Sequence, residues 1–88
     1  MTTRTDRSST TWKRIADMII EMAPIPVAEW DAGTHLIDDL GYDSVTAVGL
    51  VFEVEREFGA EPAPDDLAFN AETLGDFTDA LAEYVSGG

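Results

Sequence analysis

Apolar residues recur at the three- and four-residue spacing of an amphipathic helix in three stretches of the chain. The first stretch follows Ser9 and Thr10, either of which can cap a helix. It ends before Pro24 and Pro26, because proline lacks the amide hydrogen that a helix interior needs. The pattern predicts a first helix whose buried stripe consists of Trp12, Ile15, Ala16, Ile19 and Met22.

The second stretch, about Ser44–Phe58, is the most apolar, and it predicts a helix that Asp43 can cap and Gly59 can end in a left-handed conformation. We expect Phe52 to be buried at the edge of its apolar face; a partly exposed Phe52 would instead suit the docking of a partner. The expected face comprises Val45, Val48, Val51, Phe52 and Phe58, and it is widened by Leu50 and Val54.

The third stretch predicts a last helix over residues 73–85, and Pro62 and Pro64 mark a loop before it. A short helix is expected over residues 65–69, between that loop and the last helix. No strand-like alternation competes, so the predicted fold is an all-α four-helix bundle with a short third helix. The apolar positions of the last helix are Leu74, Phe77, Leu81, Tyr84 and Val85.

The remaining segments divide the chain into one domain and two ends. We expect a disordered N-terminal tail over residues 1–8, a folded domain over residues 9–86 and a frayed end at 87–88. Residues 23–43 form a connection too long to be structureless, and 34–39 are expected to make a helical turn. The apolar anchors of this connection are Val27, Trp30, Leu36, Ile37 and Leu40.

Charge restricts the partners that the protein can have. The 88 residues include 18 acidic and 5 basic side chains and no cysteine, and the net charge is −13. Such a field repels nucleic acid and attracts basic protein surfaces.

The sequence holds no apolar segment of a signal peptide and none long enough to span a membrane. We expect a cytoplasmic monomer without nucleic-acid or membrane partners.

No constellation of residues predicts catalysis or metal binding. The sequence around Ser44 lacks the Gly-x-Ser-x-Gly spacing of a hydrolase, and nothing places His35, the only histidine, beside it as a base. The acids of residues 38–43 lack the ligand alternation of a calcium loop. We therefore predict a protein that is not an enzyme, with no catalytic residue and no metal site.

Ser44 remains, at the start of the most apolar helix. A serine there most often caps the helix. If Asp43 is the cap, the Ser44 hydroxyl occupies the first helical position and points outward, where it suits covalent attachment of a phosphodiester. Backbone amides and the positive end of the helix dipole would stabilise the phosphate.

The segment Asp38-Asp39-Leu40-Gly41-Tyr42-Asp43-Ser44-Val45 resembles the attachment motif of acyl carrier proteins, in which Leu-Gly-x-Asp-Ser-Leu is typical. The resemblance continues through Glu57-Phe58-Gly59 and Thr73-Leu74-Gly75-Asp76 and covers about residues 12–85. It implies a four-helix fold and 4′-phosphopantetheine on Ser44, transferred from coenzyme A by a separate magnesium-dependent phosphopantetheinyl transferase. The thiol of that group would hold acyl chains as thioesters.

Two departures from the family pattern affect partner docking, which the resemblance assigns to the second helix and to basic partner enzymes. Val45 stands where leucine is usual, and Thr46 and Gly49 stand where acids are frequent. Gly49 is either tolerated drift at the surface or a place that permits close approach of a partner backbone or of a bulky carried chain. The docking residues that we predict are Asp38, Asp39, Asp43, Val45, Phe52, Glu53 and Glu57.

Tyr42 makes the motif more similar to carriers of bacterial aromatic polyketide pathways. The resemblance thus implies a discrete carrier in polyketide or hybrid metabolism, served by a ketosynthase, an acyltransferase or similar enzymes. A free-standing aminoacyl or peptidyl carrier is the alternative, because Thr46, Gly49 and Phe52 fit neither polyketide nor fatty-acid patterns closely. An acidic interaction module without a prosthetic group is the alternative from another class.

Overall fold

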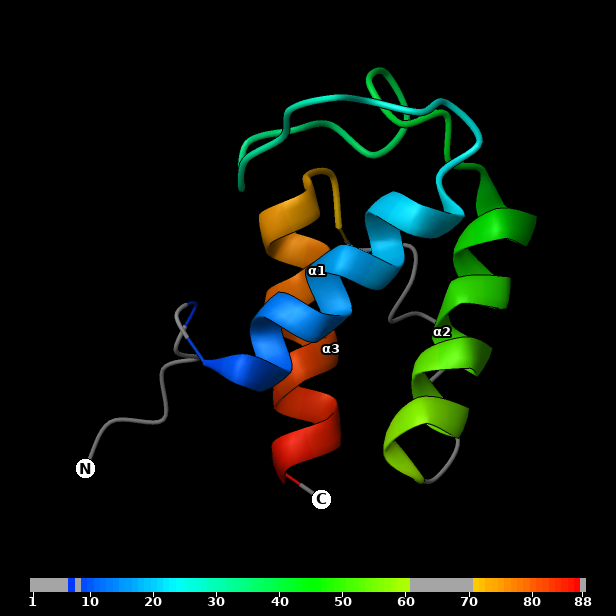
Figure 1. Cartoon of the computed structure of the whole chain (residues 1–88). Helices are drawn as coiled ribbons and strands as arrows, with labels where there is room; N and C mark the ends of the chain where they lie inside the picture. Colours follow the sequence, from blue (N-terminus) through cyan, green and yellow to red (C-terminus); the bar gives the residue numbers. More distant parts are fainter. Residues whose placement is uncertain (1–6, 8, 61–70, 88) are drawn as a thin grey trace.

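The computed structural model describes residues 7, 9–60 and 71–87, and three helices make up most of these described residues (Figure 1). They are α1 (Thr10–Met22), α2 (Ser44–Phe58) and α3 (Leu74–Gly87). Within the described residues the only strand-like pairing is an isolated bridge between His35 and Thr73. The all-α prediction is confirmed for this part of the chain, whereas the short helix expected over 65–69 lies outside the described residues.

The helices begin and end where local chemistry requires it. The Ser9 side chain accepts a hydrogen bond from the Trp12 amide at 3.1 Å and caps α1, and Ala23 leaves the helix in an extended conformation just before Pro24. Gly59 ends α2 with a φ of 63°, the left-handed geometry expected of it. The Thr73 hydroxyl accepts from the Asp76 amide at 3.1 Å and so caps α3.

The core lies between the three helices and beneath the connection of residues 23–43. In Figure 1, α1 crosses α3, and the first turns of α2 and α3 lie at the same end of the bundle, under that connection. Burial of the apolar side chains in this core is the main stabilising contribution to a domain of this size. The buried apolar residues are Trp12, Ile15, Ala16, Ile19, Leu36, Leu40, Tyr42, Ala47, Leu50, Val51, Val54, Leu74, Phe77, Leu81 and Ala82.

The predicted buried face of α2 is wrong in part. Val45 is 81% exposed and Phe52 is 58% exposed, although both were expected on the apolar face. The buried stripe has the spacing i, i+3, i+4 and i+7: it confirms Leu50, Val51 and Val54 of the predicted face and adds Ala47. Because α2 is apolar on nearly all sides, periodicity alone does not choose which side meets α1 and α3.

The connection of residues 23–43 packs over the core as expected and is hydrogen-bonded to the start of α3. The Leu36 amide donates to the Glu72 carbonyl at 3.0 Å, and the Leu74 amide donates to the Thr34 carbonyl at 2.7 Å. The predicted turn over 34–39 forms, since the Asp39 amide donates to the His35 carbonyl at 3.1 Å. Two expected core residues are nevertheless exposed, Met22 at the end of α1 and Ile37, which is 72% exposed.

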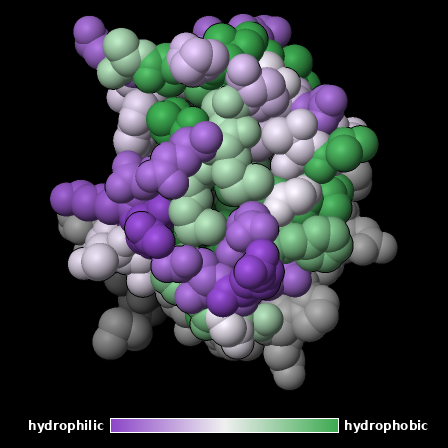
Figure 2. Space-filling view, turned by 45° about the vertical axis from the view of Figure 1, so that its right-hand side comes forward, coloured by the Kyte–Doolittle hydropathy of each residue, from purple (hydrophilic) through white to green (hydrophobic). Residues whose placement is uncertain are grey.

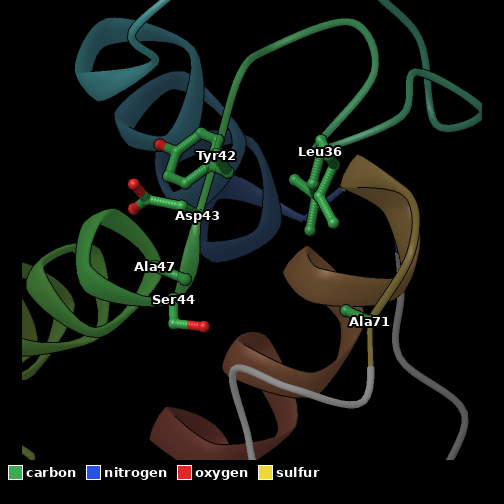
Figure 3. Close-up of a pocket in the computed structure, with 7 residues that line it drawn as sticks. Leu36, Tyr42, Asp43, Ser44, Ala47 and Ala71 are labelled. Carbon is green, nitrogen blue, oxygen red and sulfur yellow. The ribbon is translucent and has the colours of Figure 1, made fainter.

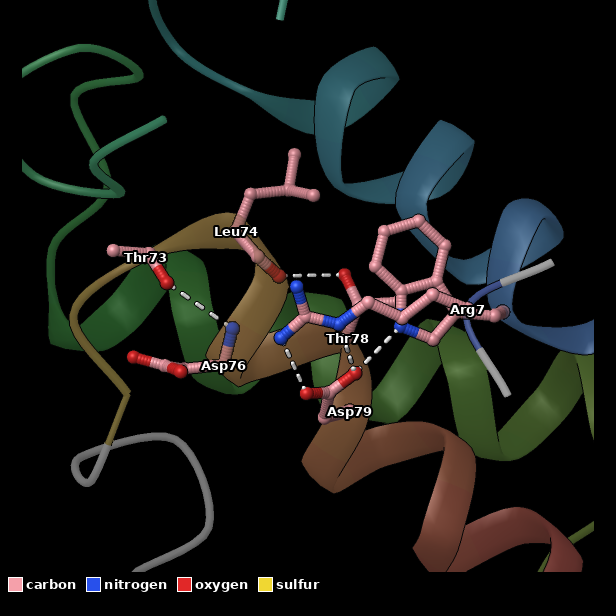
Figure 4. Close-up of polar contacts among 7 residues, drawn as sticks. Arg7, Thr73, Leu74, Asp76, Thr78 and Asp79 are labelled. Atoms are coloured by element: carbon pink, nitrogen blue, oxygen red, sulfur yellow. Dashed lines mark hydrogen bonds and ion pairs between the residues drawn. The ribbon is translucent and has the colours of Figure 1, made fainter. Parts of the chain in front are cut away.

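Arg7 lies within the segment expected to be a tail, yet it contacts α3 (Figure 4). Its guanidinium makes two hydrogen bonds to the Asp79 carboxylate, at 3.0 and 2.7 Å, and the Trp12 indole donates to the same carboxylate at 2.7 Å. Partial burial opposes ionisation of Asp79, but the hydrogen bonds from Arg7 and Trp12 outweigh it and lower the pKa of the carboxyl. This cluster holds the start of α1 against α3.

Candidate functional site

The start of α2 positions the side chain of Ser44. Asp43 is the N-cap, because its carboxylate accepts a hydrogen bond from the Thr46 amide at 2.8 Å and its carbonyl accepts from the Ala47 amide at 2.9 Å. Ser44 is therefore the first helical residue, and it is exposed. Figure 3 shows its hydroxyl pointing away from the Asp43 carboxylate, toward the side where Ala71 lies.

Asp43 is held ionised by the bonds that make it a cap. Hydrogen bonding from the Thr46 backbone, assisted by the Thr46 side chain, lowers the pKa of the Asp43 carboxyl. The carboxylate is thereby committed to the helix end. It leaves the neighbouring hydroxyl unhindered but does not activate it, so a base for any reaction at Ser44 must come from elsewhere.

The two residues before Asp43 fix the direction in which α2 begins. Gly41 has a φ of 77°, and a Cβ at this position would lie 2.9 Å from Ile25 Cγ1, so both backbone and space favour glycine. Tyr42 is buried, and its hydroxyl donates to the Ile19 carbonyl in α1 at 2.6 Å. Burial raises the pKa of the Tyr42 phenol.

A cavity of about 350 Å³ opens beside Ser44. Aliphatic and aromatic surfaces form most of its wall, and the Ser44 hydroxyl and Asp43 supply the polar edge (Figure 3). Sequence reasoning did not identify its alanines, although Ala47 stands three residues after Ser44 on the same side of α2. The lining residues are Leu36, Ile37, Tyr42, Asp43, Ser44, Ala47 and Ala71.

A second cavity, of about 420 Å³, adjoins the first and shares Ile37 and Ala71 with it. The rest of its wall is polar and is formed by His35, Asp38 and Glu72. His35 thus lines the second cavity and not the one at Ser44. Within the described residues no group of three histidine or acidic side chains is arranged to hold a metal ion.

Most of the acids predicted for docking interact with other residues of the protein. Glu57 forms an ion pair with Arg14 of α1 at 2.9 Å, and Glu53 pairs with Arg56 at 3.2 Å. Asp39 accepts a hydrogen bond from the His35 amide at 2.8 Å, and Asp38 is exposed. Val45 and Phe52, also predicted for docking, are exposed on α2.

The start of α2 presents an exposed hydroxyl group. An exposed serine stands at the first position of a fifteen-residue helix, where amides and the helix dipole favour a phosphate, and an apolar cavity lies next to it. These features fit a phosphodiester-linked group with an apolar portion. No helix in the described part of the chain combines the length and the apolar character needed to cross a membrane.

Comparison with known families agrees with this geometry. The family described as "Phosphopantetheine attachment site" matches residues 13–81, which is most of the chain and includes most of α1, all of α2 and the first turns of α3. The chain therefore belongs to the phosphopantetheine-attachment family of carrier proteins, and its prosthetic group is covalently attached 4′-phosphopantetheine.

Proposed function

We propose that the protein is an acyl carrier protein in which Ser44 bears the 4′-phosphopantetheine group. The observation that carries the proposal is the exposed Ser44 hydroxyl at the first position of α2, beside an apolar cavity. Among the other serines, Ser9 uses its side chain to cap α1. When bound, the prosthetic group supplies a thiol that holds acyl groups as thioesters.

The attachment reaction needs only a nucleophile from this chain. Ser44 Oγ forms a bond to the phosphorus that bears the pantetheine portion of coenzyme A, and the phosphoanhydride bond to the nucleotide half breaks. Adenosine 3′,5′-bisphosphate leaves, and the hydroxyl proton passes to a base of the phosphopantetheinyl transferase. A separate enzyme is required because Asp43, the adjacent acid, is committed to the helix cap.

The lining of the cavity beside Ser44 supports an apolar cargo. Leu36, Ala47 and the Tyr42 ring give it walls that stabilise an alkyl or polyketide chain better than a charged group. The biosynthetic pathway that the protein serves is proposed from the segment Leu40-Gly41-Tyr42-Asp43-Ser44. This segment resembles the attachment motif in carriers of aromatic polyketide synthesis.

An aminoacyl or peptidyl cargo is the second candidate, and the adjoining cavity favours it. Asp38 and Glu72 line that cavity and would stabilise an ammonium group. Loading the two classes of cargo in parallel separates the candidates.

The test is intact mass after incubation with coenzyme A, magnesium and a broad-specificity phosphopantetheinyl transferase. We expect one phosphopantetheine addition to the wild type and to Ser9→Ala, and none to Ser44→Ala. No addition to the folded wild type would instead favour an acidic interaction module without a prosthetic group.

A further inference from the structure

Residues 32–36 of the long connection pair with residues 72–75 along the start of α3, and we call these two segments the ladder. Besides the bonds of Leu36 and Leu74 in the ladder, the Gly75 amide donates to the Ala32 carbonyl at 2.9 Å. The first amides of a helix have no partner within that helix. The connection therefore satisfies backbone groups that α3 leaves open.

The two ends of the ladder have different surroundings. At one end, which we call the cavity end, Leu36 and Ala71 line the cavity beside Ser44. At the other, the tight end, a Cβ added to Gly75 would lie 2.8 Å from the Ala32 carbonyl oxygen. The ladder thus forms a wall of the cavity at one end and has no spare room at the other.

Arg7 lies at the tight end of the ladder and joins it to two helices (Figure 4). A Cβ added to Gly75 would also lie 3.2 Å from Arg7 Nη2, so the guanidinium and the connection approach the same glycine. The guanidinium forms two hydrogen bonds to Asp79 of α3 and lies 5.9 Å from the centre of the Trp12 ring in α1. One side chain therefore holds the tight end from both sides.

A second ion pair joins two helices at a distance from the cavity. Arg14 of α1 pairs at 2.9 Å with Glu57, which lies at the opposite end of α2 from Ser44. Figure 2, which brings the α2 side of the molecule forward, shows hydrophilic side chains among hydrophobic ones on this surface. The Arg14 side chain is 53% exposed and that of Arg7 is 49% exposed. The two arginines thus share their chemistry and exposure but differ in position.

We propose that the ladder is a lid over the cavity beside Ser44, clamped at its tight end by Arg7, and that it opens at its cavity end to admit the apolar portion of the carried chain. A lid fixed at one end opens from the other, because the bonds at the free end can break while the helices stay in place. Release of Arg7 frees both ends, so the lid opens more often. The clamp is a property of the chain alone, whereas the part played by the carried chain rests on the proposed function.

Amide hydrogen exchange of the full chain without cargo, followed residue by residue by NMR, tests the clamp. In the wild type we expect the Leu36 amide, corrected for its intrinsic rate, to exchange at least about threefold faster than the Gly75 amide. Arg7→Gln should speed exchange at Gly75 about tenfold, because a two-bond ionic contact is lost. Asp79→Asn, which removes the opposite charge, should act in the same way. The matched control Arg14→Gln should leave exchange at Gly75 within about threefold of the wild type.

Cleavage of an octanoyl thioester by hydroxylamine tests the role of the lid. A broad-specificity phosphopantetheinyl transferase and octanoyl coenzyme A load each variant, and intact mass follows the loss of the octanoyl group. A chain held in the cavity keeps its thioester close to the protein, where hydroxylamine reaches it less often. We expect Arg7→Gln to raise the cleavage rate at least about threefold, because the lid is open for a larger fraction of the time. Arg14→Gln should cleave at the wild-type rate.

Each part of the proposal has a result that would overturn it. Equal exchange at Gly75 in Arg7→Gln and Arg14→Gln would show that Arg7 is no clamp. Faster exchange with unchanged thioester cleavage would show that the lid does not hold the carried chain. If the folded wild type gains no octanoyl-phosphopantetheine, the proposed function itself is wrong, and the exchange experiment still decides the clamp. Circular dichroism and the Tm verify that each variant is folded.

Discussion

The hydrogen bond from Tyr42 to Ile19 offers a direct test of how the site is held. The Tyr42 hydroxyl donates to the Ile19 carbonyl at 2.6 Å within the buried part of the protein. Ile19 belongs to the last turn of α1, where carbonyls lose their helical partners, and the Ala23 amide donates to Ile20 instead. The phenol therefore satisfies a carbonyl that α1 leaves open.

The variant Tyr42→Phe removes this bond while keeping the ring and its packing. A buried carbonyl left without a partner costs about 1–3 kcal/mol, and a short, well-made bond belongs in that range. For a domain of this size, 1 kcal/mol corresponds to a Tm change of about 4–8 °C. We expect the free energy of unfolding to fall by roughly 1–2 kcal/mol and the Tm by about 5–15 °C.

The assay is urea unfolding followed by far-UV circular dichroism, with the slope against urea compared between the two proteins to verify that both unfold in two states. A loss below about 0.5 kcal/mol would refute the reasoning, since it would mean that water or another group hydrogen-bonds to the Ile19 carbonyl equally well.

Alkaline pH gives a second test of the same hydrogen bond. Because burial raises the pKa of Tyr42, wild-type stability is full below the unfolded-chain pKa of about 10 and falls above it, so the difference between the two proteins should shrink there.

Four further outcomes follow from the structure. Gly49→Ala should raise the free energy of unfolding by about 1 kcal/mol in a thermal melt, because a Cβ there meets nothing and alanine favours the helix. Gly75→Ala should lower it by about 1–3 kcal/mol, since its Cβ would lie 2.8 Å from the Ala32 carbonyl oxygen; equal effects of the two alanines would contradict both arguments. The depressed pKa of Asp43 stabilises the fold above about pH 4 and is lost as the pH falls through the folded-state value, so Asp43→Asn should flatten the acid side of a Tm–pH curve. Salt should raise the Tm of a chain with a net charge of −13, and an unchanged Tm between about 0.01 and 0.5 M salt would show that its acids are too dispersed to repel one another.

Local chemistry in the sequence predicted most of the helical framework. Pro24, Asp43 and Gly59 act within a few residues of themselves, so their effects on helix ends could be read directly. The same holds for the exposure of Ser44, which follows once Asp43 is known to be the cap. The cofactor followed from a motif of adjacent residues around Ser44 and is confirmed by the family match.

Features that depend on distant residues escaped prediction. The contact of Arg7 with Asp79 joins positions 72 residues apart, and the bond of Tyr42 to Ile19 spans 23 residues. No periodicity encodes such pairings. The exposure of Phe52 was missed for a related reason, because the side of α2 that is buried depends on where α1 and α3 lie.

The bonds between the long connection and the start of α3 have a consequence for the newly made chain. Ala32, Thr34 and Leu36 each share a backbone hydrogen bond with a residue between 72 and 75, about forty positions later, and the connection ends at the cap of α2. The geometry around Ser44 is therefore complete only after the start of α3 has emerged from the ribosome. A transferase that requires this geometry would act only after the connection and the start of α3 have paired, so that a primed molecule is also one that has folded at this site.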